Sequence, residues 1–284
     1  MDGIIIVNKP SGYTSHTIVS KIRKKFNIKK VGHTGTLDPL ATGVLPILLG
    51  SGTKLSKYLI NHDKEYIATI KLGVKTDTAD IEGNIIEEAE IPILSEEQIK
   101  NVLKNFEGVQ YQKPPMYSAI KVNGKKLYEY ARNGQTIDVQ ARKIEIYNIE
   151  LLKYEGEFIE IKVACSKGTY IRSLCEDIAK KLDTIGTMAT LQRTKVGEFT
   201  LEEAIEMEEL EEIQQIQKKL ITAEELFKIY SSINLKEQEM QHFLNGVKVT
   251  RNEADGLYKI YNQNGKFVGI GEIKEGRLKR DWVE

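Results

Sequence analysis

One aspartate stands in the segment of this chain that is best suited to hold a reactive group. Residues 32–45 read GHTGTLDPLATGVL, in which Asp38 precedes Pro39. The glycines of this segment are Gly32, Gly35 and Gly43. Glycine permits positive φ or the close approach of another backbone, and proline biases the residue before it away from helical angles. The segment therefore predicts a loop that holds Asp38, although an Asp-Pro pair alone is more often a helix cap or a turn.

The cysteines and histidines do not form a comparable pattern. Cys165 and Cys175 lie ten residues apart, and the four histidines are scattered at positions 16, 33, 62 and 242. This spacing predicts neither a zinc site nor a disulfide framework. Because free cysteines are usually buried, we expect both to be core residues.

The elements that must position these groups mix strands and helices without a regular βαβ repeat, which predicts an α+β fold. Residues 3–9, 66–72 and 157–165 read as strands, and the last of these places alternate apolar residues on one side. A helix capped by Thr14 or Ser15 should bury one apolar face, made of Ile18, Val19, Ile22 and Phe26. A second helix begins near Ile171, with Gly186 as its expected stop.

The length of 284 residues fits a large domain followed by a small one. The character of the sequence changes near residue 230, after a Glu-rich stretch at 202–212 that reads as helical. Beyond it, Asn264-Gly265 separates two alternating segments and predicts a β-hairpin with a type I′ turn. We therefore expect domains at 1–229 and 230–284, the second one rich in strands.

Charge is balanced overall, with 41 basic and 41 acidic residues, but it is unevenly distributed. Residues 21–30 hold six basic and no acidic side chains, and residues 121–143 hold six basic against two acidic. These segments could contact phosphates, while solvated surface is the alternative. The sequence has no secretory signal pattern and no apolar stretch approaching about 18 residues, so a cytoplasmic protein is expected.

Six sequence blocks, in order, resemble the TruB family of tRNA pseudouridine-55 synthases. They are NKPSGYTS at 8–15, the segment GHTGTLDPLATGVLP, KEYIATIKLGVKTDTADIEG at 64–83, PPMYSAIKVNGKKLYEYAR at 114–132, CSKGTYIRSLCEDIA at 165–179 and LQRTKVGEF at 191–199. The blocks span most of residues 3–199. The resemblance implies a pseudouridine synthase fold, a mixed sheet with flanking helices.

The resemblance also implies which residues act. Asp38 matches the family's catalytic aspartate, Arg172 the arginine that pairs with it, and Tyr66 the tyrosine that stacks on the flipped uracil and is implicated in removing its C5 proton. A paired guanidinium would keep Asp38 ionised in a dry pocket. The reaction breaks an N-glycosidic bond and rejoins uracil through carbon, so no metal or redox cofactor is expected. For Arg172 a surface role and for Tyr66 a packing role are the alternatives.

Further residues match substrate-binding positions of the family. His33 matches the histidine that enters the RNA near the flipped base, with a structural histidine as the alternative. Lys9 with Pro10 matches a motif that supports the active-site loop. The remaining expected substrate contacts are Lys64, Asp80, Tyr170 and Leu191.

The implied substrate is the T arm and elbow of tRNA, bound by a monomer. Residues 110–143 resemble the family's mobile RNA-clasping insertion, with an ordered structural hairpin as the alternative. Residues 232–284 resemble a PUA-like RNA-binding domain. Two other functions stay open: a guide-RNA-dependent synthase of the dyskerin kind, against which the short N-terminus argues, and a tRNA-folding chaperone.

Overall fold

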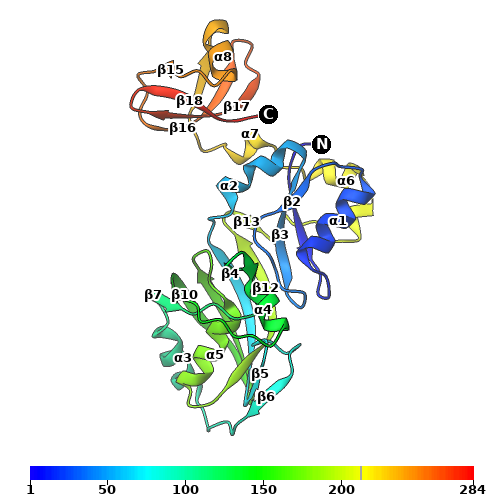
Figure 1. The fold of residues 1–284 in the computed structure, drawn as a ribbon, viewed down its shortest axis with the longest axis vertical. Coiled ribbons are helices and arrows are strands. Elements are labelled where there is room, and N and C mark those ends of the chain that lie inside the picture. Colours follow the sequence, from blue (N-terminus) through cyan, green and yellow to red (C-terminus); the bar gives the residue numbers. More distant parts are fainter. Residues whose placement is uncertain (212) are drawn as a thin grey trace.

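The computed structural model describes residues 1–211 and 213–284, and its centre is a nine-stranded mixed sheet (Figure 1). Along its main path the strands are β1 (Gly3–Lys9), β3 (Thr42–Leu49), β12 (Gly186–Val196), β4 (Lys64–Leu72), β11 (Phe158–Cys165), β10 (Arg142–Glu155) and β7 (Gly108–Gln112). Two short strands, β2 (Val31–His33) and β13 (Phe199–Thr200), pair with β3 and β12. The β3–β12 pairing is parallel and the other pairings are antiparallel.

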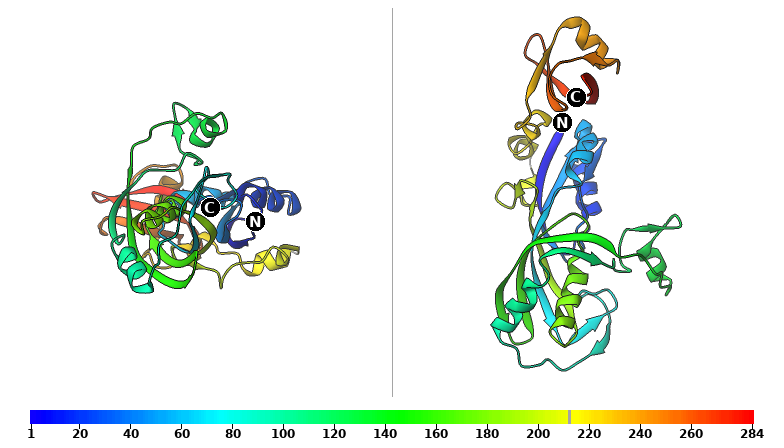
Figure 2. Two further views of the ribbon diagram at one scale, coloured as in Figure 1. Left: turned by 90° about the horizontal axis from the view of Figure 1, so that it is seen from below. Right: turned by 90° about the vertical axis from the view of Figure 1, so that its left-hand side faces the viewer.

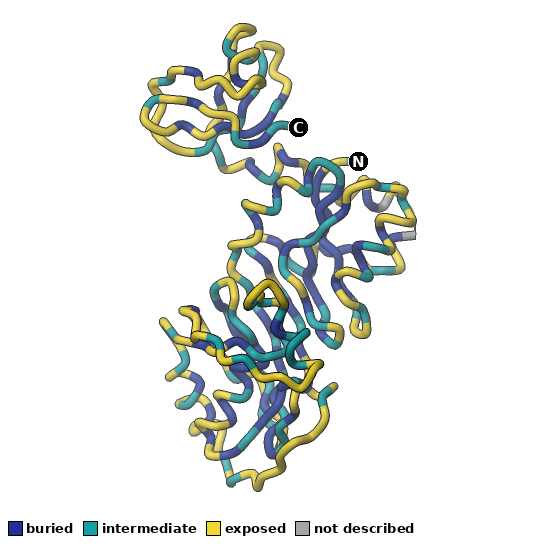
Figure 3. Tube along the Cα trace, viewed as in Figure 1, coloured by how far each residue is buried: buried dark blue, intermediate teal, exposed yellow. Residues whose placement is uncertain are grey.

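The principal helices cover this sheet with the apolar faces expected from their sequences. Helix α1 (Ser15–Lys25) buries Ile18, Val19 and Ile22. Helix α5 (Ile171–Lys181) packs on β12, and α3 (Glu96–Lys104) packs on β10. Burial follows the strands of the sheet, while the loops at its ends are exposed (Figure 3). The predicted α+β class with flanking helices is confirmed.

Shorter elements connect or extend the sheet. Two hairpins lie outside it, one formed by β5 (Val74–Thr76) and β6 (Ile85–Glu88), the other by β8 (Lys121–Val122) and β9 (Lys125–Lys126). The second hairpin continues into α4 (Leu127–Arg132) and projects from the body of the molecule in both views of Figure 2. The remaining short helices are η1 (Gly50–Leu55), α2 (Ser56–Leu59), η2 (Glu209–Glu211), α6 (Ile213–Lys218) and α7 (Ala223–Leu226).

A separate five-stranded sheet forms one end of the molecule (Figure 1). Its order is β14 (Ser232–Leu235), β16 (Gly256–Asn262), β17 (Phe267–Lys274), β18 (Arg277–Val283) and β15 (Val249–Thr250), with α8 (Glu237–Leu244) packed against it. The C-terminal part is therefore rich in strands, as predicted.

One apolar cluster joins this end to the central sheet. Phe267, Ile270 and Trp282 of the C-terminal sheet share it with Phe227 of the connecting segment and with residues of the central part, which include Ile4, Val44, Leu48, Leu59 and Phe199. The Asp281 carboxylate also accepts hydrogen bonds from Tyr58 and Lys57. The contact between the two parts is thus both apolar and polar.

Three local predictions are wrong. Helix α5 ends at Lys181, and the left-handed residue after it is Asp183, with φ 58°. Gly186 is instead the first residue of β12, and it must be glycine because a Cβ there would lie 2.7 Å from the Ala179 Cβ. At the hairpin of β16 and β17 only Gly265 has positive φ, which excludes a type I′ turn. The stretch 202–212 is mostly turns before η2, and residue 212 lies outside the described residues.

The helices within the described ranges include none that is long and apolar enough to cross a membrane.

Candidate functional site

The loop that carries Asp38 runs from β2 to β3, and the segment 32–45 around it depends on two of its three glycines. Gly35 and Gly43 have φ values of 83° and 106°. A Cβ at Gly43 would lie 2.2 Å from the Arg193 carbonyl oxygen, so only glycine permits β3 to approach β12 there. Gly32 has neither feature, because its φ is not positive and a Cβ would meet only an ordinary contact at 3.9 Å.

Ser15 fixes the loop immediately before Asp38. Thr14, not Ser15, caps α1: its side chain accepts a hydrogen bond from the Thr17 amide. The Ser15 hydroxyl instead accepts from the Leu37 amide at 2.9 Å and donates to the Leu37 carbonyl at 3.3 Å. Since Ser15 is buried, this exchange ties the residue next to Asp38 to the start of a rigid helix.

Lys9 fixes the loop on the other side of Asp38. Its side chain is fully buried, and its ammonium group donates to the carbonyl oxygens of Pro10, Tyr13 and Pro39 at 2.9, 2.7 and 3.1 Å. Burial lowers the pKa of Lys9 to about 8, against the opposing effect of the Asp38 carboxylate. The lysine thus connects the segment after β1 with the residue that follows Asp38.

Asp38 and Arg172 form a two-point ion pair. Arg172 Nε lies 3.1 Å from Asp38 Oδ2, and Arg172 Nη2 donates to Asp38 Oδ1 at 3.3 Å. The arginine is buried at the start of α5, whereas a third of the Asp38 side chain is exposed. Two contacts that join the same pair of groups fix the carboxylate plane as well as its position.

Arg172 also holds two other segments. Its Nη1 donates to the Thr78 carbonyl at 3.0 Å and lies 3.4 Å from Asp80 Oδ2, and its Nη2 donates to the Tyr117 carbonyl at 2.8 Å. Asp80 is itself buried, and its Oδ1 accepts from the Thr78 hydroxyl and the Glu82 amide. Both oxygens of Asp80 are therefore engaged within the protein.

Burial raises the pKa of Asp38 above the usual carboxyl value. The Arg172 and Lys9 cations act in the opposite direction, while the Asp80 carboxylate adds to the increase. A carboxylate with these neighbours is partly desolvated and faces a fixed cation, an environment in which it could act as a nucleophile.

Three further predicted residues line the same region. Tyr66 on β4 and Leu191 on β12 are buried, and Tyr170 immediately precedes α5. Burial raises the pKa of the Tyr66 and Tyr170 phenols, and the charge of Asp38 contributes to the increase in both. The structure thus brings the two tyrosines within electrostatic range of Asp38, and Leu191 packs in the same apolar cluster as Tyr66 and Leu37. The Asp38 carboxylate stays partly open to solvent.

Gln112 connects the insertion to α5. Its Oε1 accepts from the Tyr170 amide at 2.8 Å, and its Nε2 donates to the Tyr170 carbonyl at 3.0 Å. The Ser173 hydroxyl donates to the Lys113 carbonyl nearby, at 3.4 Å. The base of residues 110–143 is therefore attached next to Arg172, while its tip projects outward.

Models of known protein families match this chain over residues 23–280. The family model described as TruB family pseudouridylate synthase (N terminal domain) matches residues 23–171. The models tRNA pseudouridylate synthase B C-terminal domain and Pseudouridine synthase II TruB, C-terminal match residues 172–244 and 231–280. The chain belongs to the TruB family.

Relatives of this TruB chain match it over nearly the whole length. A tRNA pseudouridine synthase B of Clostridium tetani is 47% identical, covering 97% of each chain. One of Caldanaerobacter subterraneus is 44% identical, covering 99% of this chain and 98% of the relative. A solved structure of an H/ACA RNP bound to a substrate RNA containing 2'-deoxyuridine is similar with a TM-score of 0.72 and 25% identity, over 99% of this chain and 84% of that one.

Two further predicted substrate contacts of the TruB chain lie at ends of strands. His33 ends β2, and its Nδ1 is buried without a hydrogen-bond partner in the described part of the chain. Burial and the Arg193 charge lower the pKa of His33. Lys64 begins β4 and donates to the Ile60 and His62 carbonyls, so its ammonium group is turned toward α2.

The sequence did not single out three residues of this TruB site. The prediction includes Ser15 only as a possible helix cap, and it includes neither Gln112 nor Arg193 as a site residue. For Arg193 a signal exists, because a charged residue two positions after the buried Leu191 lies on the inward face of a strand. Ser15 and Gln112 have no local signal, since their partners are 22 and 58 residues away.

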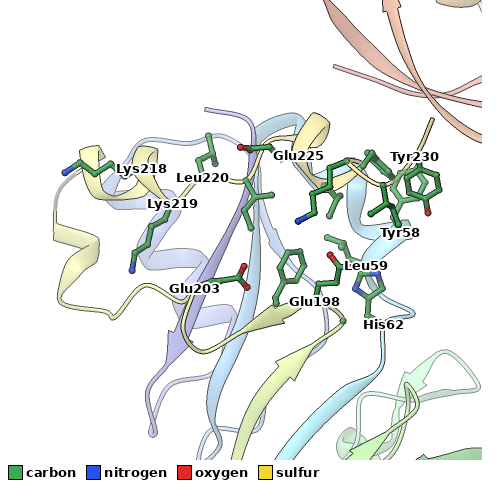
Figure 4. A pocket seen from close by; sticks show the side chains of 17 residues that line it. Tyr58, Leu59, His62, Glu198, Glu203, Lys218, Lys219, Leu220, Glu225 and Tyr230 are labelled. Carbon is green, nitrogen blue, oxygen red and sulfur yellow. The ribbon is translucent and has the colours of Figure 1, made fainter. Parts of the chain in front are cut away.

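A cavity of about 670 Å³ lies apart from Asp38, beside the segment that leads to the C-terminal sheet. Lys218 and Lys219 lie at one end of it, and Tyr58, Tyr230 and His62 at the other (Figure 4). Its lining includes none of the predicted site residues, and it is formed by the central part and by the segment that leads to β14.

Proposed function

We propose that this chain isomerises uridine to pseudouridine at position 55 in the T loop of tRNA. The observation that carries the proposal is the two-point ion pair of Asp38 and Arg172, in a chain whose relatives are named tRNA pseudouridine synthase B. Their identity of 44–47% favours this substrate over the guide-dependent alternative, which the 25% identity to the H/ACA RNP structure would suggest.

In this reaction Asp38 supplies the carboxylate that lets uracil detach from its ribose. Arg172 orients the carboxylate, and Asp80 holds Arg172. Tyr66 stacks on the freed base and accepts its C5 proton, while Tyr170 and Leu191 line the pocket. His33 occupies the space that the flipped base leaves, because extruding a base costs a few kcal/mol that the enzyme must offset. Lys64 contacts the RNA at the edge of the site, and Lys9 with Pro10 supports the loop.

RNA binding involves two further parts of the chain. The insertion at 110–143 closes over phosphates with its basic residues, and the C-terminal sheet acts as a PUA-like domain. We place the domain limits at 1–229 and 230–284, supported by the start of β14 at Ser232. The enzyme acts as a monomer in the cytoplasm, where it meets unmodified tRNA.

The test is tritium release from C5-labelled uridine in an unmodified tRNA transcript, with neither guide RNA nor cofactor added. Wild type should release tritium, and replacement of uridine 55 should abolish the release. An Asp38→Asn variant should bind the transcript and release none. Tritium release by that variant would contradict the role of Asp38.

A tRNA-folding activity is a second candidate, favoured by the basic insertion that projects from the site. It is separable, because folding assistance should survive Asp38→Asn whereas isomerisation should not. Dependence of wild-type release on an added guide RNA would instead support the dyskerin-like alternative.

A further inference from the structure

Arg193 is a buried cation without a carboxylate partner in the part of the chain that the structure describes. Only 1% of the residue is exposed. Its Nε donates to the Val44 carbonyl at 2.8 Å and its Nη2 to the Gly35 carbonyl at 3.2 Å. A buried charge is costly, and buried arginines are normally paired with carboxylates. The retention of this charge beside the active-site loop therefore requires another explanation.

The side chain that faces this charge is Tyr66. The two residues are direct partners in the pairing of β12 with β4, so their side chains leave the sheet on the same side and lie next to each other. Both are buried, so little solvent screens their interaction. Tyr66 is the titratable neighbour whose charge bears most on Arg193.

None of the other titratable groups named here directs a positive charge at the Tyr66 phenol. Cys165 faces the phenol from β11 and Asp38 faces it from the loop before β3, and both oppose its ionisation. Lys64, on the same strand, directs its ammonium group to the Ile60 and His62 carbonyls. Burial raises the pKa of the Tyr66 phenol, and Arg193 is the group that acts in the opposite direction.

We propose that Arg193 is a positioning residue that stabilises the ionised Tyr66 phenol as the acceptor of the uracil C5 proton. This inference rests on the proposed function. Once C5 has bonded to the ribose C1′, the phenolate oxygen takes the C5 proton. The electron pair of the C5–H bond forms the C5=C6 double bond, and the C6=N1 pair moves to N1, which takes a proton from water. The phenol then returns its proton to solvent.

Two substitutions separate the charge of Arg193 from its contacts to the loop. Arg193→Lys keeps a cation, and Arg193→Met removes it while retaining an unbranched side chain. Both variants lose the pair of hydrogen bonds that the guanidinium group donates to the Gly35 and Val44 carbonyls. A purely structural role of Arg193 would therefore be impaired in both. A difference in behaviour between the two variants therefore measures the effect of a positive charge at position 193.

The first readout needs no RNA. In protein labelled with ¹³C at the tyrosine Cζ, the Tyr66 signal is assigned by its absence in Tyr66→Phe and followed against pH. Because a close opposite charge shifts a pKa by about 1–3 units, Tyr66 should titrate at least about one pH unit higher in Arg193→Met than in wild type, and close to wild type in Arg193→Lys. Equal values in all three proteins would overturn the inference.

The wild-type protein alone also tests the inference. A Tyr66 phenol that remains protonated until the protein unfolds would overturn the inference, even where Arg193→Met does not fold. In single-turnover tritium release, the alkaline rise of the rate should move to higher pH in Arg193→Met, and Arg193→Lys should restore it. Absence of release by wild type would reject the proposed function, whereas the titration of Tyr66 would still test its coupling to Arg193.

Discussion

The amide of Gln112 pairs with both main-chain groups of Tyr170, accepting from its N–H and donating to its C=O. This pairing holds the residue that precedes α5, two positions before Arg172. The strand that leads into the insertion is thereby attached to the helix that carries the partner of Asp38.

Replacing Gln112 with Glu should slow isomerisation by about 10–100-fold, since a carboxylate cannot donate to the Tyr170 carbonyl and leaves it unsatisfied. Single-turnover tritium release measures the effect. The matched control is Gln110→Glu on the same strand, because Gln110 donates to the Phe106 carbonyl, away from α5. Equal losses in the two variants would contradict the assignment.

Replacing Ser15 with Ala should reduce the rate as well as the stability. The substitution removes both hydrogen bonds to Leu37 and should cost about 1–3 kcal/mol of unfolding free energy, with a rate loss of about tenfold as Asp38 becomes less fixed. Thr14→Ala is the control: loss of the helix cap should cost about 1 kcal/mol and leave the rate nearly unchanged. Denaturant unfolding and single-turnover rates give the comparison.

Replacing Arg172 with Lys should lower the single-turnover rate on the order of 100-fold, because a point charge cannot reproduce the two contacts with Asp38. Affinity for the transcript should change little, since Arg172 is buried beneath the loop. Filter binding alongside tritium release separates the two effects. A variant that loses affinity but keeps its rate would show that Arg172 serves RNA binding instead.

The lowered pKa of Lys9 predicts that the free energy of unfolding depends on pH. Its pKa in the folded protein is about 8, below the ordinary value of 10.5, so between these values the unfolded chain binds the extra proton. The cost of burying the ammonium group is present below pH 8 and is relieved as the pH rises toward 10.5. Relative to Lys9→Met, wild type should therefore gain about 1–3 kcal/mol of unfolding free energy between pH 7.5 and about 10.5.

Denaturant unfolding of both proteins across that range tests this prediction. The comparison with Lys9→Met is needed because other lysines and tyrosines titrate there as well. A difference between the two proteins that does not change with pH would show that Lys9 is charged to the same extent in the folded and unfolded states.

Local patterns predicted much of the fold. Alternation placed Ile159, Ile161 and Val163 on the buried face of β11, and helical spacing placed Ile18 and Ile22 of α1 in the core. The failures are local too: Gly186 resembled a helix stop, although Asp183 takes the left-handed conformation and close packing on Ala179 requires the glycine.

Some contacts of the site were predictable from the sequence, and others were not. The resemblance joined Asp38 to Arg172 across 134 residues, and the structure brings them together, while their catalytic roles stay predictions. Ser15 and Gln112 escaped prediction because each side chain acts through the main chain of a distant residue. A hydrogen bond to a main-chain group does not depend on the side chain of the residue that provides that group. The type of that residue therefore gives no sign of the contact.

The apolar cluster that contains Phe227, Phe267 and Trp282 also fixes the distance between the Asp38 region and the C-terminal sheet. Because it is continuous from Ile4 to the C-terminal sheet, the separation between Asp38 and that sheet is set by packing and not by a flexible tether. An RNA that touches both must present its two contact points at that spacing. Inserting or deleting one base pair between them would displace and rotate one point relative to the other, so the proposed function implies that RNA arms are discriminated by their geometry before any base is read.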